Sequence, residues 1–243
     1  MADASSAHAR PVQEQAYYGD TYITDTEAYV VASSGSVGEG DDGGTSPWIA
    51  VSPNIFHPQG GGQPSDEGTV DGGPVTPGRN DEGLVILTGD ALSGSRLSIG
   101  DAVQCSVDAD KRRLHAALHT AGHVLGALGE ARGWRHSGHS HFPGQARLDF
   151  DPEGHEDELA TPELREAVRA ELQAGMDQAL ATRGAVTASM DENGHRTVTI
   201  EGVNAEPCGG THVRSLADLT NVRILEVKIK RGAIKVRYEA EHA

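Results

Sequence analysis

Short stretches in the first half of the chain alternate between apolar and polar residues. They cover positions 22–31, 49–55 and 84–87, and Gly, Asp, Ser or Pro residues separate them. Alternation with a period of two is typical of strands that bury one face. Many short strands joined by turns favour a small closed barrel or a sandwich, so we expect a β-rich, barrel-like N-terminal domain.

The period becomes helical after Asp110. Apolar residues recur there at steps of three and four, at Leu114, Leu118, Ala121, Leu125 and Leu128. This spacing predicts a helix with one buried face. Gly129 and Gly133 lie where we expect the helix to end.

A second helix is indicated by its terminal signals. Thr161 followed by Pro162 matches an N-cap residue followed by a proline in the first turn. Apolar residues then recur along one face as far as Leu180. We expect Gly184 to end this helix.

Strands are predicted again at 197–200, 222–229 and 233–238. Helices placed between strands favour an α+β arrangement, with the helices packed on one face of a mostly antiparallel sheet. We therefore expect two domains, which cover residues 1–108 and 109–243.

The charge of the chain is unevenly distributed. The net charge is −16, which argues against a nucleic-acid partner because phosphate binding normally needs a basic field. Residues 1–110 carry 3 Lys and Arg against 17 Asp and Glu, whereas residues 111–243 carry 17 against 19. The C-terminal end is locally basic, so it either contacts phosphates or presents solvated strand faces; its cations are Arg223, Lys228, Lys230, Arg231, Lys235 and Arg237.

Targeting signals and cysteine usage indicate a cytoplasmic protein. The first residues are polar, and no run approaches the roughly 20 apolar residues of a membrane span. Cys105 and Cys208 are too few for a disulfide framework, so a functional cysteine is better explained as a ligand or a nucleophile. The Gly-rich, acidic stretch 34–46 is predicted to be a mobile loop.

Two pairs of metal-binding residue types have the same four-residue spacing. His119 and His123 lie one turn apart on the predicted helix, so both imidazoles project from one side. Cys208 and His212 lie in a Gly-rich turn. Each pair alone fits a solvated face or a simple turn, but together they supply three nitrogens and one sulfur, a set that zinc accepts tetrahedrally.

Two glycine clusters accompany these pairs. Gly209 and Gly210 allow a tight turn between two ligands and expose amide groups to an oxygen anion. Gly60, Gly61 and Gly62 precede Gln63 in the segment PQGGGQPSDEG, where another molecule can approach the main chain closely. Taken alone, each cluster also fits an ordinary turn or loop.

The three motifs PQGGGQPSDEG, HTAGHVL and CGGTHV, in this order, resemble the editing domain of alanyl-tRNA synthetase and its free-standing AlaX relatives. The resemblance covers residues 56–243. It implies that His119, His123, Cys208 and His212 bind zinc and that the GGGQP loop borders the site. The candidate substrate-binding residues are therefore Gly60, Gly61, Gly62, Gln63, Gly209 and Gly210. It also implies a deacylase that acts in trans on mischarged tRNA, removing Ser, Gly or Ala from alanine tRNA.

One departure from the family pattern concerns the segment after the metal-binding helix. The family usually has a Gln-x-Gly-Ser-like stretch there, and His136 occupies the Gln position. A neutral imidazole suits general base work, so His136 is a candidate catalytic residue, and His115 is a candidate one turn before His119. The altered pocket makes a threonine analogue, as in fluorothreonyl-tRNA, an alternative substrate.

Two further alternatives come from other functional classes. The chain could be a zinc-containing tRNA-binding module without hydrolytic activity, or an unrelated zinc hydrolase of small esters. The second alternative lacks an HExxH motif and leaves the GGGQP loop without an explanation. The sequence also allows zinc either to activate water or to organise the site, because four protein ligands leave no open position. No pattern indicates an oligomeric state.

Overall fold

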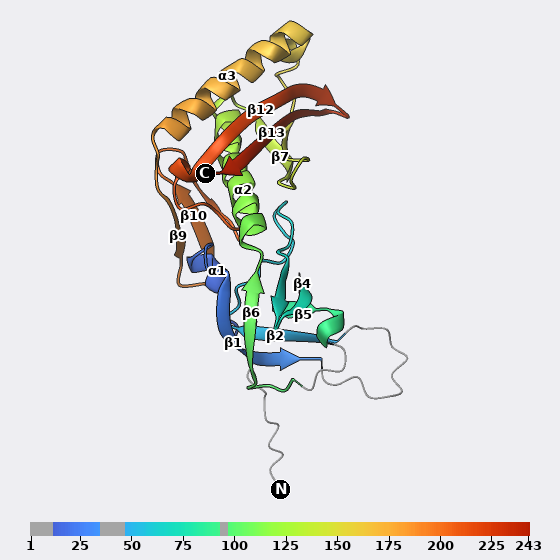
Figure 1. Cartoon of the computed structure of the whole chain (residues 1–243). Coiled ribbons are helices and arrows are strands. Elements are labelled where there is room, and N and C mark those ends of the chain that lie inside the picture. The colour runs from blue at the N-terminus through green and yellow to red at the C-terminus, as the bar shows by residue number, and fades with distance from the viewer. Residues whose placement is uncertain (1–11, 35–46, 93–96) are drawn as a thin grey trace.

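The computed structural model describes residues 12–34, 47–92 and 97–243 (Figure 1). Apart from Ser34, the predicted loop at 34–46 lies outside the described residues. The first part of the chain holds α1 (Ala16–Gly19), β1 (Asp25–Ser33), β2 (Trp48–Ser52), β3 (Gly68–Val70), β4 (Gly73–Arg79), β5 (Val85–Thr88), η1 (Asp90–Leu92) and β6 (Ala102–Val107). The second part holds α2 (Ala109–Ala131), β7 (Arg135–Ser140), β8 (Arg147–Asp151), η2 (Asp157–Leu159), α3 (Pro162–Ala181), β9 (Val186–Met190), β10 (Arg196–Ile200), β11 (Asn204–Pro207), η3 (Leu216–Asp218), β12 (Leu219–Lys230) and β13 (Ala233–His242).

The first six strands form a closed antiparallel barrel. Its strand order is β1-β2-β5-β4-β3-β6. Alternate side chains of each strand point inward, and Val30, Val51, Leu87 and Val103 are buried there. The prediction of a barrel-like N-terminal part is therefore confirmed.

Helix α2 leaves the barrel directly after β6. Its N-cap is Asp108, whose carboxylate accepts the Lys111 N–H at 3.0 Å. The helix continues through Gly129 and stops only before Gly133, which has a φ of +86°. Gly129 lies inside the helix because Phe150 packs against it, where an added Cβ would lie 2.5 Å from the ring.

The second part is α+β, as predicted. Its main sheet is antiparallel, in the order β12-β13-β8-β7, and a smaller sheet has the order β11-β10-β9. Figure 1 shows α2 and α3 beside the main sheet, and side chains of both helices share one core with it. Thr161 caps α3 by accepting the Leu164 N–H at 3.3 Å; the helix ends at Ala181, before the predicted stop at Gly184.

A buried ion pair joins the barrel to α2. Arg112 of the helix pairs with Asp66 of the segment before β3, and both side chains are 0% exposed. Arg112 also donates to the carbonyl oxygens of Thr21 at 3.0 Å and Ile55 at 2.6 Å. These contacts fix the GGGQP segment against the helix that carries His119 and His123. The division into domains at residue 108 stays a prediction.

The length and polarity of the helices bear on the membrane question. Among the described residues, no helix is both long enough and apolar enough to span a bilayer.

Candidate metal centre

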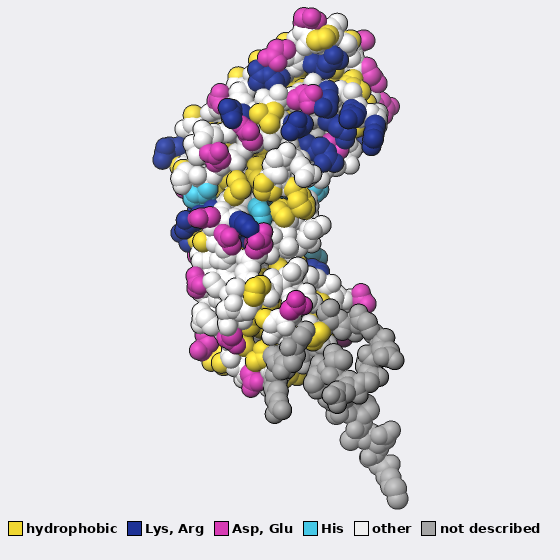
Figure 2. Space-filling model, turned by 45° about the vertical axis from the view of Figure 1, so that its right-hand side comes forward, with side chains coloured by type: hydrophobic (Ala, Val, Ile, Leu, Met, Phe, Trp, Pro, Cys, Tyr) yellow, Lys and Arg dark blue, Asp and Glu magenta, His cyan; other side chains and the backbone are white. Residues whose placement is uncertain are grey.

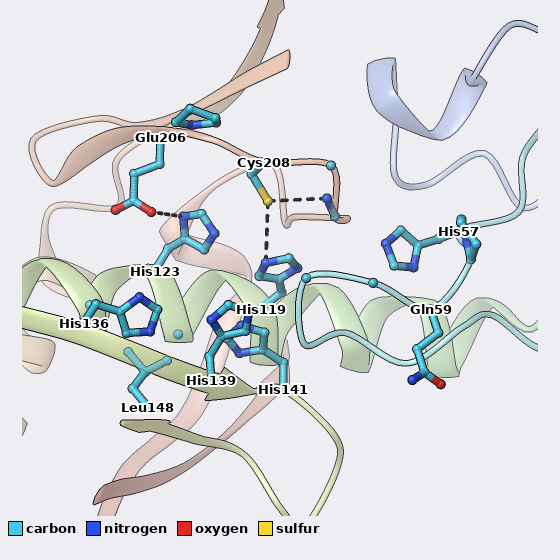
Figure 3. Close-up of a pocket in the computed structure, with 18 of the residues that line it drawn as sticks. His57, Gln59, His119, His123, His136, His139, His141, Leu148, Glu206 and Cys208 are labelled. Carbon is cyan, nitrogen blue, oxygen red and sulfur yellow. Dashed lines mark hydrogen bonds and ion pairs between the residues drawn. The ribbon is translucent and has the colours of Figure 1, made fainter. Parts of the chain in front are cut away.

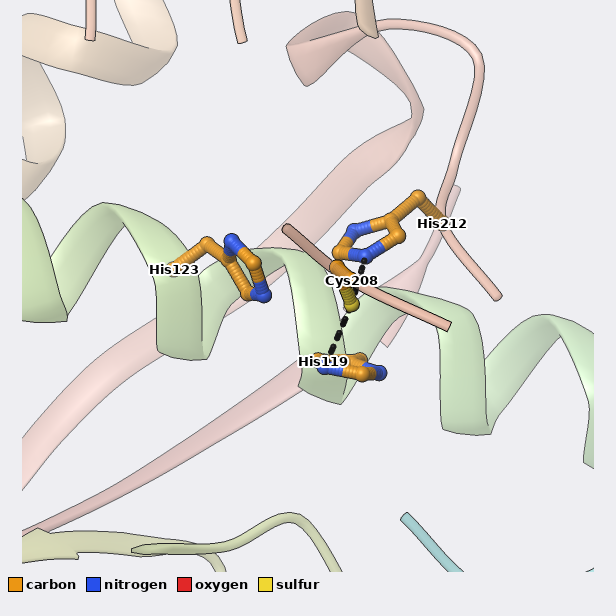
Figure 4. Close-up of side chains that lie close together, drawn as sticks. All are labelled: His119, His123, Cys208 and His212. Atoms are coloured by element: carbon orange, nitrogen blue, oxygen red, sulfur yellow. Dashed lines mark hydrogen bonds between the residues drawn. The ribbon is translucent and has the colours of Figure 1, made fainter. Parts of the chain in front are cut away.

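The structure brings both predicted ligand pairs together (Figure 4). His119 and His123 project from α2, while Cys208 and His212 lie in the turn after β11, and their ligand atoms lie within 4.8 Å of one another. Cys208 Sγ is 3.5 Å from His119 Nε2 and 3.3 Å from His212 Nε2. Tetrahedral zinc, with bonds of about 2.1 Å to nitrogen and about 2.3 Å to sulfur, requires N···S separations of about 3.5 Å. The donor set therefore fits a tetrahedral metal ion.

The His212 ring is oriented by Thr120. Thr120 donates its hydroxyl proton to the Ala116 carbonyl at 2.8 Å, so its Oγ1 accepts from His212 Nδ1 at 3.1 Å. The same Oγ1 accepts the Val213 N–H at 3.2 Å. This arrangement places the proton of His212 on Nδ1 and leaves the Nε2 lone pair for a metal.

Gln63 orients the His119 ring in the same way. Its amide group donates to Thr211 Oγ1 at 2.9 Å, and its Oε1 accepts the Thr211 N–H at 3.0 Å. The remaining contact of Oε1, at 2.7 Å, is with His119 Nδ1, which must therefore be the donor. Gln63 is completely buried, so the structure places this predicted substrate-binding residue behind a ligand.

Glu206 faces the third imidazole. Its carboxylate lies 3.6 Å from His123 Nδ1 (Figure 3). Asn204 donates to that carboxylate at 2.5 Å. The three imidazoles thus have their Nδ1 atoms near an amide oxygen, a hydroxyl oxygen and a carboxylate. Hydrogen-bonded partners of this kind fix the tautomer of metal-binding histidines, and here they do so for His119 and His212.

Burial keeps the three ligand imidazoles neutral. It holds the pKa values of His119 and His212 well below their ordinary value and lowers that of His123 to about 4. Burial also raises the pKa of the Cys208 thiol, which the Gly210 amide and Arg196 oppose. Neutral histidines are ready to bind a metal, and a bound cation deprotonates a coordinating thiol.

The turn that holds Cys208 and His212 leaves no room for a side chain at Gly210. A Cβ there would overlap the His119 ring and lie 2.8 Å from Gln63 Oε1. The Gly210 N–H donates to Cys208 Sγ at 3.4 Å, whereas Gly209 is exposed. The role of the two glycines in substrate binding stays a prediction.

Arg196 of β10 holds the same turn from the other side. Its guanidinium donates to the carbonyl oxygens of Cys208 at 2.8 Å and Gly210 at 2.9 Å. It also donates to the Tyr18 carbonyl at 3.1 Å and lies over the Tyr18 ring, 5.0 Å from its centroid. Through Arg196, Tyr18 of α1 therefore supports the turn that carries Cys208 and His212.

A pocket of about 470 Å³ opens beside the four ligands (Figure 3). The exposed Gly60 and Gly61 border it from the barrel, and Gly209 and Gly210 border it from the metal-binding turn. Gly62 has a φ of +71° and packs against the end of β7, where its carbonyl accepts the His141 N–H at 2.8 Å. The pocket continues along α2 past Gly122 to Gly126.

The two candidate catalytic histidines have different positions. His136 lines the pocket on β7, is exposed, and its Nε2 lies 3.0 Å from the Gly138 carbonyl. His115 is buried and is not part of the pocket lining; its pKa is lowered mainly by burial. The catalytic roles of both residues stay predictions.

Sequence reasoning missed several residues of the site. His139 and His141 continue the row begun by His136, and the His141 ring stacks on His119 with 4.5 Å between centroids. His141 Nδ1 lies 2.6 Å from the Tyr238 hydroxyl, which donates to the Leu118 carbonyl. The histidine-rich run 136–141 was a signal for this wall of the pocket. The positions of Glu206 and Arg196 had no comparable signal.

We expect Gln63→Met to weaken metal binding without unfolding the chain. Methionine nearly keeps the volume but loses the acceptor for His119 Nδ1–H, so the metal dissociation constant should rise about 10- to 100-fold. Competition with a chromophoric zinc chelator measures this change. Gln59→Met, on the exposed part of the same loop, is the matched control. Equal affinities for the two variants would contradict the orienting role of Gln63.

Comparisons with known proteins place the chain in a family. The profile described as "Threonyl and Alanyl tRNA synthetase second additional domain" matches residues 195–237, which include Cys208 and His212. The alanyl-tRNA editing protein AlaX-M of Pyrococcus horikoshii is 29% identical over 90% of this chain and 91% of its own length. The AlaX-M protein of Methanosarcina barkeri is 29% identical over 89% of this chain and 94% of its own length.

Alanine–tRNA ligases match a similar stretch of the chain. The ligase of Frankia alni is 35% identical over 82% of this chain, but the match spans only 24% of the ligase. The chain thus corresponds to about a quarter of the ligases and to nearly the whole length of the AlaX-M proteins. The chain belongs to the AlaX-type family of alanyl-tRNA editing domains.

Proposed function

We propose that this chain is a zinc-dependent deacylase that hydrolyses the ester between a wrongly attached small amino acid and alanine tRNA. The observation that carries this proposal is the position of the His₃Cys cluster at the wall of a pocket bordered by the GGGQP loop. The names of the AlaX-M relatives support the substrate class.

The reaction adds water to the ester carbonyl carbon and breaks the acyl–oxygen bond, which releases the amino acid and the terminal hydroxyl of the tRNA. Bound zinc would supply a fixed positive charge beside the ester. Gln63 and Thr120 orient two of the imidazoles that would hold it, and the Glu206 carboxylate lies 3.6 Å from the third. Gly60, Gly61 and Gly209 leave main chain exposed where the aminoacyl end enters.

The space at Gly126 makes a threonyl analogue, such as fluorothreonine, a second candidate substrate. Beyond the ligands the pocket reaches Gly126, where an added Cβ would meet nothing closer than Leu148 at 3.7 Å. His136 also lines the pocket. The extra methyl group of a threonyl side chain has room there, and His136 offers a hydrogen-bond partner to a hydroxyl.

A panel of tRNAs charged with Ser, Gly, Ala, Thr or fluorothreonine tests both candidates. We expect rapid release of one of these amino acids by the purified protein. His136→Gln should change the Ser-to-Thr ratio of kcat/KM about tenfold, whereas His195→Gln, an exposed histidine outside the pocket lining, should leave it unchanged. Binding of tRNA without hydrolysis of any ester would favour the non-catalytic alternative.

A further inference from the structure

The main sheet exposes a strongly basic surface on the side away from α2. A depression of about 330 Å³ is lined by six cationic side chains from β8, β12, β13 and the turn between the last two. We call this surface the basic face; it consists of Arg147, Lys228, Lys230, Arg231, Lys235 and Arg237. Figure 2 shows Lys and Arg side chains gathered on the half of the molecule that holds the β12–β13 hairpin.

The strand register places like charges directly opposite one another on the basic face. Lys228 of β12 lies opposite Lys235 of β13, and Arg237 of β13 lies opposite Arg147 of β8. Like charges at directly opposed positions destabilise a sheet. The same register also places Glu226 opposite Arg237 and Asp149 opposite Lys235, so carboxylates offset part of this repulsion and a bound anion would offset the rest.

Acidic neighbours neutralise only part of the basic face. Asp149 accepts from Lys235 at 2.7 Å and from Arg147 at 3.2 Å, and Glu226 pairs with Lys228 at 2.5 Å. Within the described part of the chain, Lys230, Arg231 and Arg237 have no ion-pair partner. Six cations against two carboxylates leave a local excess of positive charge on a chain whose net charge is −16.

The basic face and the pocket lie on opposite sides of one sheet, close to the same edge. Leu148 of β8 faces the core, and His139 of β7 lies opposite it and lines the pocket. Arg147 points to the other side, and β8 is the direct neighbour of the edge strand β7. Adjacent strands are about 4.8 Å apart, so only a short path around β7 separates the basic face from the pocket.

We infer that the basic face binds the phosphate backbone of the tRNA whose aminoacylated end enters the pocket. This inference rests on the proposed function. Lys and Arg side chains bind phosphates by charge, and Arg adds a planar fork of donors. A flexible single-stranded 3′ end can pass around the β7 edge while the helical stem lies on the basic face.

The test is a triple variant that removes the three unpaired cations, Lys230→Ala with Arg231→Ala and Arg237→Ala. Its matched control removes one Lys and two Arg elsewhere, Lys111→Ala with Arg113→Ala and Arg183→Ala. Uncharged alanine tRNA is the binding probe. We expect the triple variant to lose at least about tenfold in tRNA affinity at physiological salt. The slope of the logarithm of its binding constant against the logarithm of salt concentration should become shallower by about 2 to 3. The control variant should stay close to wild type in both measurements.

A second measurement separates this inference from the proposed function. Seryl-adenosine carries the ester without the RNA backbone, so the triple variant should hydrolyse it at the wild-type rate while its KM for charged tRNA rises. If the wild type hydrolysed neither seryl-adenosine nor charged tRNA, the proposed deacylase function would be refuted. The tRNA-binding measurement would still test the role of the basic face. If the triple variant bound tRNA as tightly as the wild type, the inference would be overturned. The same conclusion would follow if the triple variant lost only its binding to phosphatidylserine vesicles.

Discussion

Cys208→Ala is expected to remove both the bound metal and the deacylase activity. The Cys208 sulfur lies 3.5 Å and 3.3 Å from two imidazole nitrogens, close to the separation that tetrahedral zinc requires, and alanine offers no replacement donor. Loss of a ligand should cost more than the roughly 10- to 100-fold typical of partners behind the ligands, so we expect at least about a 100-fold loss of metal affinity and of kcat/KM. Metal analysis and release of amino acid from charged tRNA measure the two effects.

The chain contains a natural control for this experiment. Cys105 is also a free cysteine, but it is buried in the barrel core on β6. Cys105→Ala removes a thiol from the protein and should lower stability without changing the metal content. His119→Ala should behave like Cys208→Ala. Full activity in a metal-free Cys208→Ala protein would contradict the assignment of the metal centre.

Gly210→Ala should disrupt the metal centre by adding a single methyl group. That methyl group would overlap the His119 ring and crowd Gln63 Oε1, so the turn or the imidazole must move. Overpacking of this kind costs about 1–3 kcal/mol. We expect a lower melting temperature and a loss of zinc comparable to that of a ligand variant, measured by calorimetry and metal analysis.

Gly209→Ala is the matched control for this variant. An added Cβ at position 209 meets nothing closer than the Tyr18 hydroxyl, at 3.4 Å. Its metal content should therefore stay at the wild-type level. If Gly210→Ala retained full zinc and unchanged stability, the close approach of the turn to His119 would be disproved.

The sequence predicted the clustering of the four candidate metal ligands because each pair is local. His119 and His123 share one helix face, and Cys208 and His212 share one turn, so spacing alone shows that each pair can converge. The orienting contacts are not local. Gln63 reaches His119 across 56 positions of sequence, which depends on how the barrel packs against α2.

The histidines that form one wall of the pocket were also hard to predict, because their positions depend on non-local packing. In a histidine-rich strand, burial decides which rings reach the site, and burial depends on the sheet register and on a bulge between His136 and Gly138. His141 is buried against His119, whereas the predicted His136 is exposed. Helix α2 ends just before Gly133, one of the two glycines predicted to end it, but it runs through Gly129, where Phe150 packs against the missing side chain.

Titration of the apo protein with zinc, followed by the rate of amino-acid release from the best-hydrolysed charged tRNA, shows whether hydrolysis depends on the bound metal. The chelated protein should be inactive, and the rate should rise in proportion to bound zinc and level off at one ion per chain. A metal-free protein that deacylates the tRNA at the full rate would refute zinc-dependent deacylation.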